Sequence, residues 1–246
     1  MTAGRDVATQ MIVAMARRLR DGETVFYGVA SPLPLLATRL AQRRHAPRLT
    51  PLNIPGGVGA APPAPRSGST VGSDMLTGSP AVFPLMDTFD LSARGGLDVV
   101  FLSGVQIDPT GAINMSAIGD LARPRTKLPG GAGSACLMPT ARRVLLWRSR
   151  HDPRSFVERL DFRTAAGNVD AVVTPLAVLA RVEGRLAVES VHEGVTLDEV
   201  RAATGFPIGP VGGREAGVPV TPPPTADERA ILDDLDPARV RDLEFR

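Results

Sequence analysis

The sequence has very little cysteine, lysine or aromatic side chain, and each shortage excludes a class of protein. Cys136 is the only cysteine among 246 residues, so the chain forms no internal disulfide and lacks a second thiol for a metal cluster. Lys127 is the only lysine, and aromatic residues make up 4% of the chain. Surfaces that bind nucleic acid usually combine a basic stripe with exposed aromatics, so we expect no nucleic-acid partner.

Long apolar runs are also missing. No segment approaches the roughly 20 apolar residues that cross a bilayer, and Arg5 and Asp6 precede an amphipathic stretch unlike a signal peptide. We therefore expect no membrane contact and a reducing, cytoplasmic location. The three histidines, His45, His151 and His192, are far apart and show no metal-ligand spacing, so we expect surface roles for them and no metal site.

The positive charge is carried by arginines that are scattered along the chain. The formal net charge is only +2, and acidic residues such as Asp152, Glu158 and Asp161 lie among the arginines. This mixture is typical of a solvated surface. Because an arginine fork also grips phosphate well, a local anionic ligand such as coenzyme A stays open as an alternative.

The chain has enough apolar sequence for a sizeable core, with 43% hydrophobic and 22% charged residues, and we predict one domain over residues 1–246. Apolar spacing predicts a helix over residues 5–20 and a buried strand over 24–30. Ser31 and Pro32 then begin a second helix that ends near Arg44. With a third strand near residues 48–53, this alternation predicts an α/β fold with a layered, mostly parallel sheet and flanking helices.

An irregular segment rich in proline, serine and glycine follows the third strand. We predict a flexible loop over residues 60–72, at the strand end where ligand sites of open α/β sheets lie, with Pro62, Pro63 and Val71 lining an acyl pocket. A plain surface excursion is the alternative. The later chain predicts a helix over 80–93, strands near 98–102, 143–147, 169–174, 177–181 and 186–190, a capped helix after Thr196, and a proline-rich tail over 218–246 with a short helix near 226–235.

Two local motifs carry side chains or backbone groups suited to a thioester ligand. Asp108-Pro109-Thr110-Gly111 matches a type I turn and predicts a hairpin flanked by the amides of Gln106 and Asn114. These amides can orient a carbonyl or pantetheine, or simply satisfy the turn backbone.

The second motif is the run Gly130, Gly131, Ala132 and Gly133, which can present N–H groups to a phosphate or an oxyanion. No nucleotide-loop lysine follows it, and a tight structural turn is its alternative. We expect Ser134 to cap the next helix and Cys136 to be a small buried side chain.

The order of these motifs along the chain resembles one enzyme family. The segments Phe101–Asp108, Gly111–Asn114, Ile118-Gly119 and Leu128–Gly131, and a tail containing Leu235-Asp236-Pro237 and Val240-Arg241, resemble the β subunits of family I coenzyme A transferases. The likeness is greatest to the glutaconate transferase branch and the related steroid ring-opening hydrolase. It implies a coenzyme A transferase-like fold, an α-type partner subunit in a heterodimer or heterotetramer, and an acyl-CoA substrate without a tightly bound cofactor.

One position departs from that resemblance. In transferases of the family, a β-subunit glutamate before the glycines of the third-strand loop attacks the acyl-CoA, and that position corresponds here to Ile54, before Gly56-Gly57. Isoleucine has no nucleophile, and the nearest acids in sequence, Glu23 and Asp74, are distant. The catalytic residue on this chain is therefore unknown. Ala112 likewise stands where the family has a further asparagine.

The departure from the transferase pattern leaves several functions open. The resemblance implies a hydrolase-like enzyme for a steroid-derived acyl-CoA, in which a glutamate of the partner acts on water. The alternatives are a transferase that uses a carboxylate elsewhere, a non-catalytic acyl-CoA-binding subunit, and a phosphosugar-type sensor domain.

Overall fold

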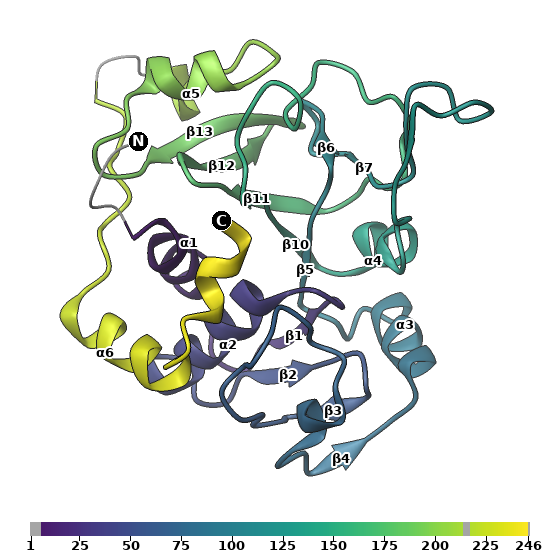
Figure 1. Cartoon of the computed structure of the whole chain (residues 1–246), viewed down its shortest axis with the longest axis vertical. Helices are drawn as coiled ribbons and strands as arrows, with labels where there is room; N and C mark the ends of the chain where they lie inside the picture. The colour runs from purple at the N-terminus through teal and green to yellow at the C-terminus, as the bar shows by residue number, and fades with distance from the viewer. Residues whose placement is uncertain (1–5, 214–216, 246) are drawn as a thin grey trace. The chain divides into compact units, whose positions relative to one another are not determined.

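A computed structural model describes residues 6–213 and 217–245 of the chain, which is drawn in Figure 1. Its Cα positions form two compact units, residues 1–101 with 223–246, and residues 102–222. The single domain predicted over residues 1–246 spans both units. Arg5, where the first helix was expected to start, and Arg246 lie outside the described residues.

The sheet of the first unit begins with parallel strands and continues with antiparallel ones. Strand β1 pairs in parallel with β2 on one side and with β5 on the other, and β2 continues through antiparallel β3 to β4. Buried apolar runs such as Val-Val-Phe in β5 suit strands that are covered on both faces. The strands are β1 (Thr24–Tyr27), β2 (Thr50–Leu52), β3 (Gly57–Val58), β4 (Ala81–Val82) and β5 (Val99–Leu102).

Helices from both ends of the chain pack together in the first unit. α1 and α2 contact each other, and both contact α6 and the short helix η3 (Figure 1). The Arg17 guanidinium after α1 reaches the Glu228 carboxylate in α6 through two hydrogen bonds, 3.0 and 2.7 Å long. The elements are α1 (Val7–Ala16), α2 (Pro32–Arg44), α3 (Leu85–Ala93), α6 (Ala226–Leu235), η1 (Ser73–Leu76) and η3 (Val240–Phe245).

One predicted helix of this unit begins later than expected. The sequence predicted a helix over residues 80–93, but Ala81–Val82 is strand β4, which pairs with β3. The helix starts only at Leu85, because Pro84 disfavours helical backbone at the residue before it, while its own fixed φ suits a helix entrance.

The second unit has its own four-stranded arrangement. β10 (Arg143–Trp147) pairs in parallel with β11 (Val169–Val173), and antiparallel β12 (Ala177–Val182) and β13 (Arg185–Val191) follow. Glu183 and Gly184 join the last two strands with φ values of 49° and 82°, so the tight turn uses left-handed backbone. α5 (Leu197–Ala203) packs on β13 and carries the predicted capping box from Thr196.

Two short hairpins complete the second unit. β6 (Gln106–Ile107) pairs with β7 (Ile113–Asn114), as the turn motif predicted, and β8 (Ala117–Ile118) pairs with β9 (Thr126–Lys127). The turn closes through a hydrogen bond of 2.9 Å from the Gly111 N–H to the Asp108 carbonyl, with Gly111 at a φ of 80°. The remaining elements are α4 (Ser134–Thr140) and η2 (Val211–Gly213).

The predicted fold class is confirmed. In the first unit α2 packs on the parallel strand β1, and in the second unit α5 packs on β13; antiparallel strands continue the parallel pairs in both units. Within the described residues, no helix has both the length and the apolar character needed to span a bilayer.

Candidate functional site

Ile54 lies in a turn directly after the parallel strand β2. The Gly56 N–H donates to the Asn53 carbonyl at 3.0 Å, which closes the turn around Ile54 and Pro55. Gly56 has a φ of 98°, and an added Cβ there would lie 2.0 Å from the Phe83 carbonyl oxygen, so only glycine fits. The predicted glycine pattern is therefore a structural turn that presents a half-buried isoleucine at the carboxyl end of β2.

Asn53 holds this turn, and the sequence analysis did not single it out. Its side chain is fully buried; the amide nitrogen donates to the Met75 carbonyl at 2.7 Å, and the amide oxygen accepts the Gly57 N–H at 2.9 Å. A polar residue directly before a Gly-rich turn at a strand end was the available signal. Asn53 thus ties the turn with Ile54 to the short helix η1.

Neither Glu23 nor Asp74, the nearest acids in sequence, lies in the turn that contains Ile54. Glu23 precedes β1, and its carbonyl accepts the Thr50 N–H, so it lies at the amino end of the parallel pair, roughly 10 Å or more from Ile54. Asp74 is exposed in η1, one residue before the Met75 carbonyl that Asn53 binds. Asp74 is therefore the nearer of the two acids to the turn.

The loop over residues 60–72 contains no helix or strand and is anchored at both ends. The Ala61 N–H donates to the Thr77 carbonyl at 2.9 Å, and the Thr70 N–H donates to the Val29 carbonyl at 3.0 Å. The Thr70 hydroxyl also bonds to the Gly28 carbonyl. The sequence placed the loop after β2; because Gly28 and Val29 follow β1, the loop also crosses the carboxyl end of β1.

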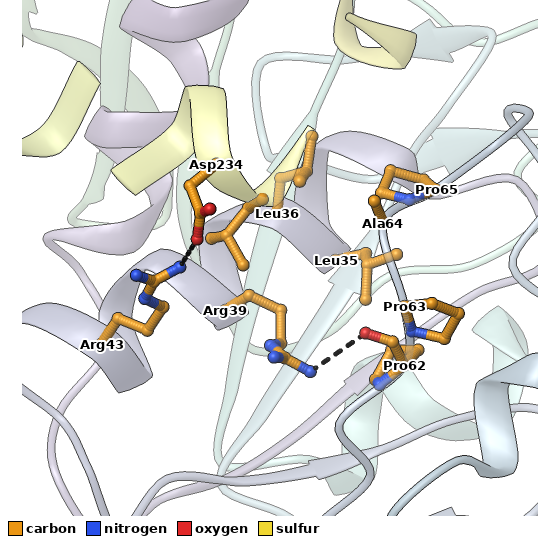
Figure 2. Close-up of a pocket in the computed structure, with 10 residues that line it drawn as sticks. Leu35, Leu36, Arg39, Arg43, Pro62, Pro63, Ala64, Pro65 and Asp234 are labelled. Atoms are coloured by element: carbon orange, nitrogen blue, oxygen red, sulfur yellow. Dashed lines mark hydrogen bonds and ion pairs between the residues drawn. The ribbon is translucent and has the colours of Figure 1, made fainter. Parts of the chain in front are cut away.

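Pro62 and Pro63 line a small pocket of about 180 Å³ between the loop, α2 and α6. Figure 2 shows Arg39 reaching from α2 toward the Pro62 carbonyl, at 3.4 Å, and Arg43 paired with Asp234. Burial lowers the pKa of Arg39. The pocket is smaller than the usual 300 Å³ or more of ligand sites and contains two arginines, so it differs from the purely apolar acyl pocket that the loop composition predicted. Val71, the third predicted lining residue, is exposed.

In the second unit, the hairpin brings the two predicted amides together. The Asn114 amide nitrogen donates to the Gln106 side-chain oxygen at 2.7 Å and to the Ala117 carbonyl at 2.6 Å, while its oxygen accepts N–H groups from Ser116 and Ala117. Asn114 is fully buried. Its amide is used within the chain, so Asn114 positions Gln106.

Gln106 lines a cavity and keeps donor capacity. Its amide oxygen accepts from Asn114 and from the Asp161 N–H, and its nitrogen donates to the Asp161 carboxylate at 3.0 Å. An amide nitrogen has two hydrogens, so one is left for the cavity that Gln106 lines. A substrate role for Gln106 stays a prediction.

The glycine run forms a backbone concavity before α4. Ala132 has a φ of 45° and Gly133 a φ of −81°, an alternation of left- and right-handed residues of the kind that points successive N–H groups to one side. The Gly130 N–H donates to the Met115 carbonyl at 2.7 Å, but the N–H groups of residues 131, 132 and 133 donate to no group within the described chain.

Thr164 connects the glycine run to the hairpin. Its hydroxyl accepts the Met115 N–H at 2.8 Å and bonds to the Ser116 hydroxyl at 2.7 Å. An added Cβ on Gly131 would lie 2.4 Å from the Thr164 methyl carbon, so this glycine allows the close approach. Thr164 was not predicted from the sequence, and no local pattern marks it. The structure thus joins both predicted motifs in one hydrogen-bonded region.

Two predictions next to the glycine run are wrong. Gly133, rather than Ser134, is the N-cap of α4, and the Ser134 hydroxyl is buried without a hydrogen-bond partner in the described chain. Cys136 is exposed rather than buried, because it lies on the outward face of the short helix α4.

The surface roles predicted for the histidines hold for His45 alone. His192 is 1% exposed, and its ring bonds to the Thr174 carbonyl at 2.8 Å. His151 stacks on Phe156, and its two ring nitrogens contact the hydroxyls of Thr174 and Thr204 at 2.9 and 3.0 Å. Burial lowers the pKa of His151 to about 4. Among the described residues, no cluster of histidine, cysteine or acidic side chains could hold a metal.

The arginines are less scattered than the sequence suggested. Four of them line the cavity of about 400 Å³ that Gln106 also lines. The signal in sequence was the pair Arg148-x-Arg150 after a strand, with Arg154 close behind; the fourth, Arg125, comes from a remote loop. The four are Arg125, Arg148, Arg150 and Arg154.

Comparison with known proteins gives one consistent result. A family model described as coenzyme A transferase matches residues 8–203. A subunit of the 3-oxoadipate CoA-transferase from Pseudomonas knackmussii is 32% identical over 80% of this chain and 82% of that protein. The cholesterol ring-cleaving hydrolase IpdB subunit of Rhodococcus jostii is 30% identical over 88% of each chain. The crystal structure of the decarboxylase AibA/AibB superposes with a TM-score of 0.89 and 31% identity, over 96% of this chain and 97% of that one.

Proposed function

Because this chain belongs to the coenzyme A transferase family, we propose that it is the β-type subunit of a two-subunit enzyme that hydrolyses an acyl-CoA thioester. The observation that carries the proposal is Ile54. It lies in the turn after β2, at the position that the resemblance assigns to the nucleophilic glutamate of the transferases, and isoleucine forms no acyl intermediate.

The reaction then needs water as the acyl acceptor. Water adds to the thioester carbonyl, the carbon–sulfur bond breaks, and the proton from water passes through a base to the coenzyme A thiolate. A general base typically contributes 100-fold to 10,000-fold. We assign this base to an α-type partner, because isoleucine cannot accept a proton and neither Glu23 nor Asp74 lies in the turn with Ile54.

The part of this chain is to bind and polarise the thioester. The N–H groups of residues 131–133 have no acceptor within the described chain and suit the oxyanion that develops on the thioester oxygen. The buried, unpartnered Ser134 hydroxyl adjoins them, only 2.8 Å from a Cβ built on Gly131. Gln106, positioned by Asn114, supplies a donor for a part of the coenzyme A thioester other than its carbonyl.

The relatives support a partner and a substrate class. One is a subunit of a CoA-transferase and another is an IpdB subunit, so we propose a hetero-oligomer for this chain as well. The ring-cleaving relative covers this chain nearly end to end, which favours a bulky, steroid-derived acyl group over a short one.

The test is chemical trapping. The complex with its partner is incubated with acyl-CoA, reduced with borohydride and digested for peptide mass spectrometry. We expect no reduced glutamyl or aspartyl residue on this chain, and Asp74→Asn should keep turnover within about twofold. A reduced adduct at Asp74 would restore the transferase alternative.

A second candidate reaction is decarboxylation. The similar AibA/AibB structure is a decarboxylase, and loss of a carboxylate as CO₂ also needs no nucleophile at Ile54. Product analysis separates the two: hydrolysis releases the free coenzyme A thiol, whereas decarboxylation releases CO₂ and leaves the thioester intact. Release of CO₂ without free thiol would replace the hydrolase proposal.

A further inference from the structure

The cavity in the second unit is unusually rich in positive charge. Its volume is about 400 Å³, and four arginines line it together with a single acid, Asp152. The walls therefore carry a formal excess of three positive charges. The arginine side chains repel one another, and the single carboxylate does not balance their charge. A bound anion would balance it, so the cavity is suited to an anionic ligand.

Asp152, the one acid that lines the cavity, accepts hydrogen bonds from the backbone of its own turn. The Asp152 carboxylate accepts the N–H groups of Arg154 at 3.0 Å and Ser155 at 2.8 Å. Partial burial opposes its ionisation, but these N–H groups and the charge of Arg148 outweigh burial and lower the pKa of Asp152. Asp152 thus stays ionised, and it shapes the segment that carries Arg154.

Three of the four guanidinium groups have no partner within the described part of the chain. The side chains of Arg125, Arg150 and Arg154 make no ion pair or hydrogen bond with any described residue, and all three are exposed. Arg148 is partly buried and has contacts of its own. By contrast, Arg143 of the same unit pairs with Asp170 at 3.0 Å. Three guanidinium groups without a partner in the described part of the chain therefore line one cavity.

The charge and the size together indicate the ligand class. A phosphate ester carries several oxygens and up to two charges per group, which several guanidinium forks can share, whereas one carboxylate would leave the excess charge largely uncompensated. Ligand sites usually span 300–1,000 Å³, so the cavity also holds more than a lone phosphate ion. Gln106, with its remaining amide hydrogen, lies on the same wall.

We infer that this four-arginine cavity binds a multiply charged phosphate ester; resting on the proposed function, its ligand is the phosphate-bearing nucleotide end of the coenzyme A thioester. The cavity then anchors the substrate through groups remote from the reacting carbonyl. Such remote binding energy helps to hold the thioester in place for reaction.

The experiment measures binding without turnover. The full chain, in complex with its partner, is titrated calorimetrically with coenzyme A, dephospho-coenzyme A, inorganic pyrophosphate and pantetheine. We expect Arg150→Glu and Arg154→Glu each to weaken coenzyme A binding about 10-fold to 100-fold and to leave pantetheine binding unchanged. Arg159→Glu, an exposed arginine outside the cavity, is the matched control and should stay within about twofold.

The competing outcomes are distinct. Pyrophosphate that competes with coenzyme A in the wild type but not in Arg150→Glu supports the site, and so does affinity that falls with added salt. Unchanged coenzyme A affinity in both charge-reversal variants overturns the inference, even if the complex hydrolyses acyl-CoA. Dissociation of the complex by Arg150→Glu also overturns it and points to an acidic partner surface. Arginine-dependent binding of coenzyme A without hydrolysis contradicts the proposed function and leaves the inference about the cavity standing.

Discussion

His151 is a half-buried base whose neutral form the fold favours, so its protonation affects stability. Burial lowers its pKa from 6.5 to about 4, against a smaller opposing effect of Asp152. Between those values the unfolded chain binds a proton that the folded chain does not, so stability falls as pH drops from about 6.5 to about 4. The full contribution is present above pH 6.5, and its loss amounts to roughly 3 kcal/mol.

The measurement is urea unfolding at a series of pH values between 7 and 4. His151→Gln should remove this part of the pH dependence, whatever it does to stability at pH 7. His45→Gln, at an exposed histidine, should leave the dependence as in the wild type. Identical pH slopes for wild type and His151→Gln would show that the ring binds protons equally in the folded and unfolded chain, and would contradict the lowered pKa.

Asn53 is the residue on which the turn with Ile54 depends. Asn53→Ala removes two buried hydrogen bonds and leaves the Met75 carbonyl and the Gly57 N–H without their partner, so we expect a loss of about 2–4 kcal/mol in the free energy of unfolding. Asn53→Asp keeps an acceptor for Gly57 but places a carboxylate against the Met75 carbonyl in a fully buried site, and should lose at least as much at neutral pH. Equal stability of Asn53→Ala and wild type in thermal unfolding would contradict this role.

At the scale of elements, the boundaries that local chemistry sets were predictable. Ser31 and Pro32 begin α2 as expected, and Thr196 makes a complete capping box with Glu199. Strand β10 matches its predicted range, Arg143–Trp147. The alternation of apolar and polar residues that marks a strand cannot be recognised in a segment of two residues. Four strands are this short and depend on pairing with residues elsewhere in the chain: β3, β4, β8 and β9. That is why the first part of the predicted 80–93 helix was wrong.

In the candidate site, too, features set by local sequence were predicted and features set by remote contacts were missed. The Asp108 turn brought Gln106 and Asn114 together as predicted, because turn chemistry is local. The arginine cavity was missed because Arg125 approaches Arg148 only through the fold, and composition alone made these arginines resemble an ordinary surface. Thr164, which links the glycine run to the hairpin, is likewise visible only in three dimensions.

The C-terminal element is held by a buried ion pair. Arg241 and Asp236 are 1% and 0% exposed and pair at 3.2 Å, and the Asp236 carboxylate also accepts the Val240 N–H at 2.8 Å. Asp236→Ala removes one of the two carboxylates that pair with the buried Arg241 guanidinium, Asp233 being the other, and the acceptor for two backbone N–H groups, so we expect unfolding to become easier by about 3–5 kcal/mol. Asp242→Ala breaks the more exposed pair with Arg239 and should cost less than about 1 kcal/mol. Denaturant midpoints of the two variants compare the pairs; equal losses would mean that burial of the Arg241 pair is unimportant.

At the scale of the whole molecule, the chain supplies binding groups but no nucleophile at Ile54, and function should therefore depend on the partner. The glycine run can polarise a thioester and Gln106 can help to hold it, but neither activates water. We expect the isolated chain to bind coenzyme A and to show no turnover above the uncatalysed rate. Turnover should rise in proportion to added α-type subunit until the two are equimolar.

Isotopic labelling decides what the assembled complex does with the acyl group. In water enriched in oxygen-18, direct hydrolysis places one labelled oxygen in the carboxylate product during a single turnover. A covalent acyl-enzyme formed on a carboxylate places the label in the enzyme whenever water attacks the enzyme carbonyl of the anhydride, so label in an enzyme carboxylate is diagnostic of that intermediate. We expect label in the product and none in Asp74. Full activity of the isolated chain would contradict a partner-supplied base. Transfer of coenzyme A to an added acid faster than hydrolysis would contradict the hydrolase proposal, because it requires a nucleophile that the turn at Ile54 does not offer.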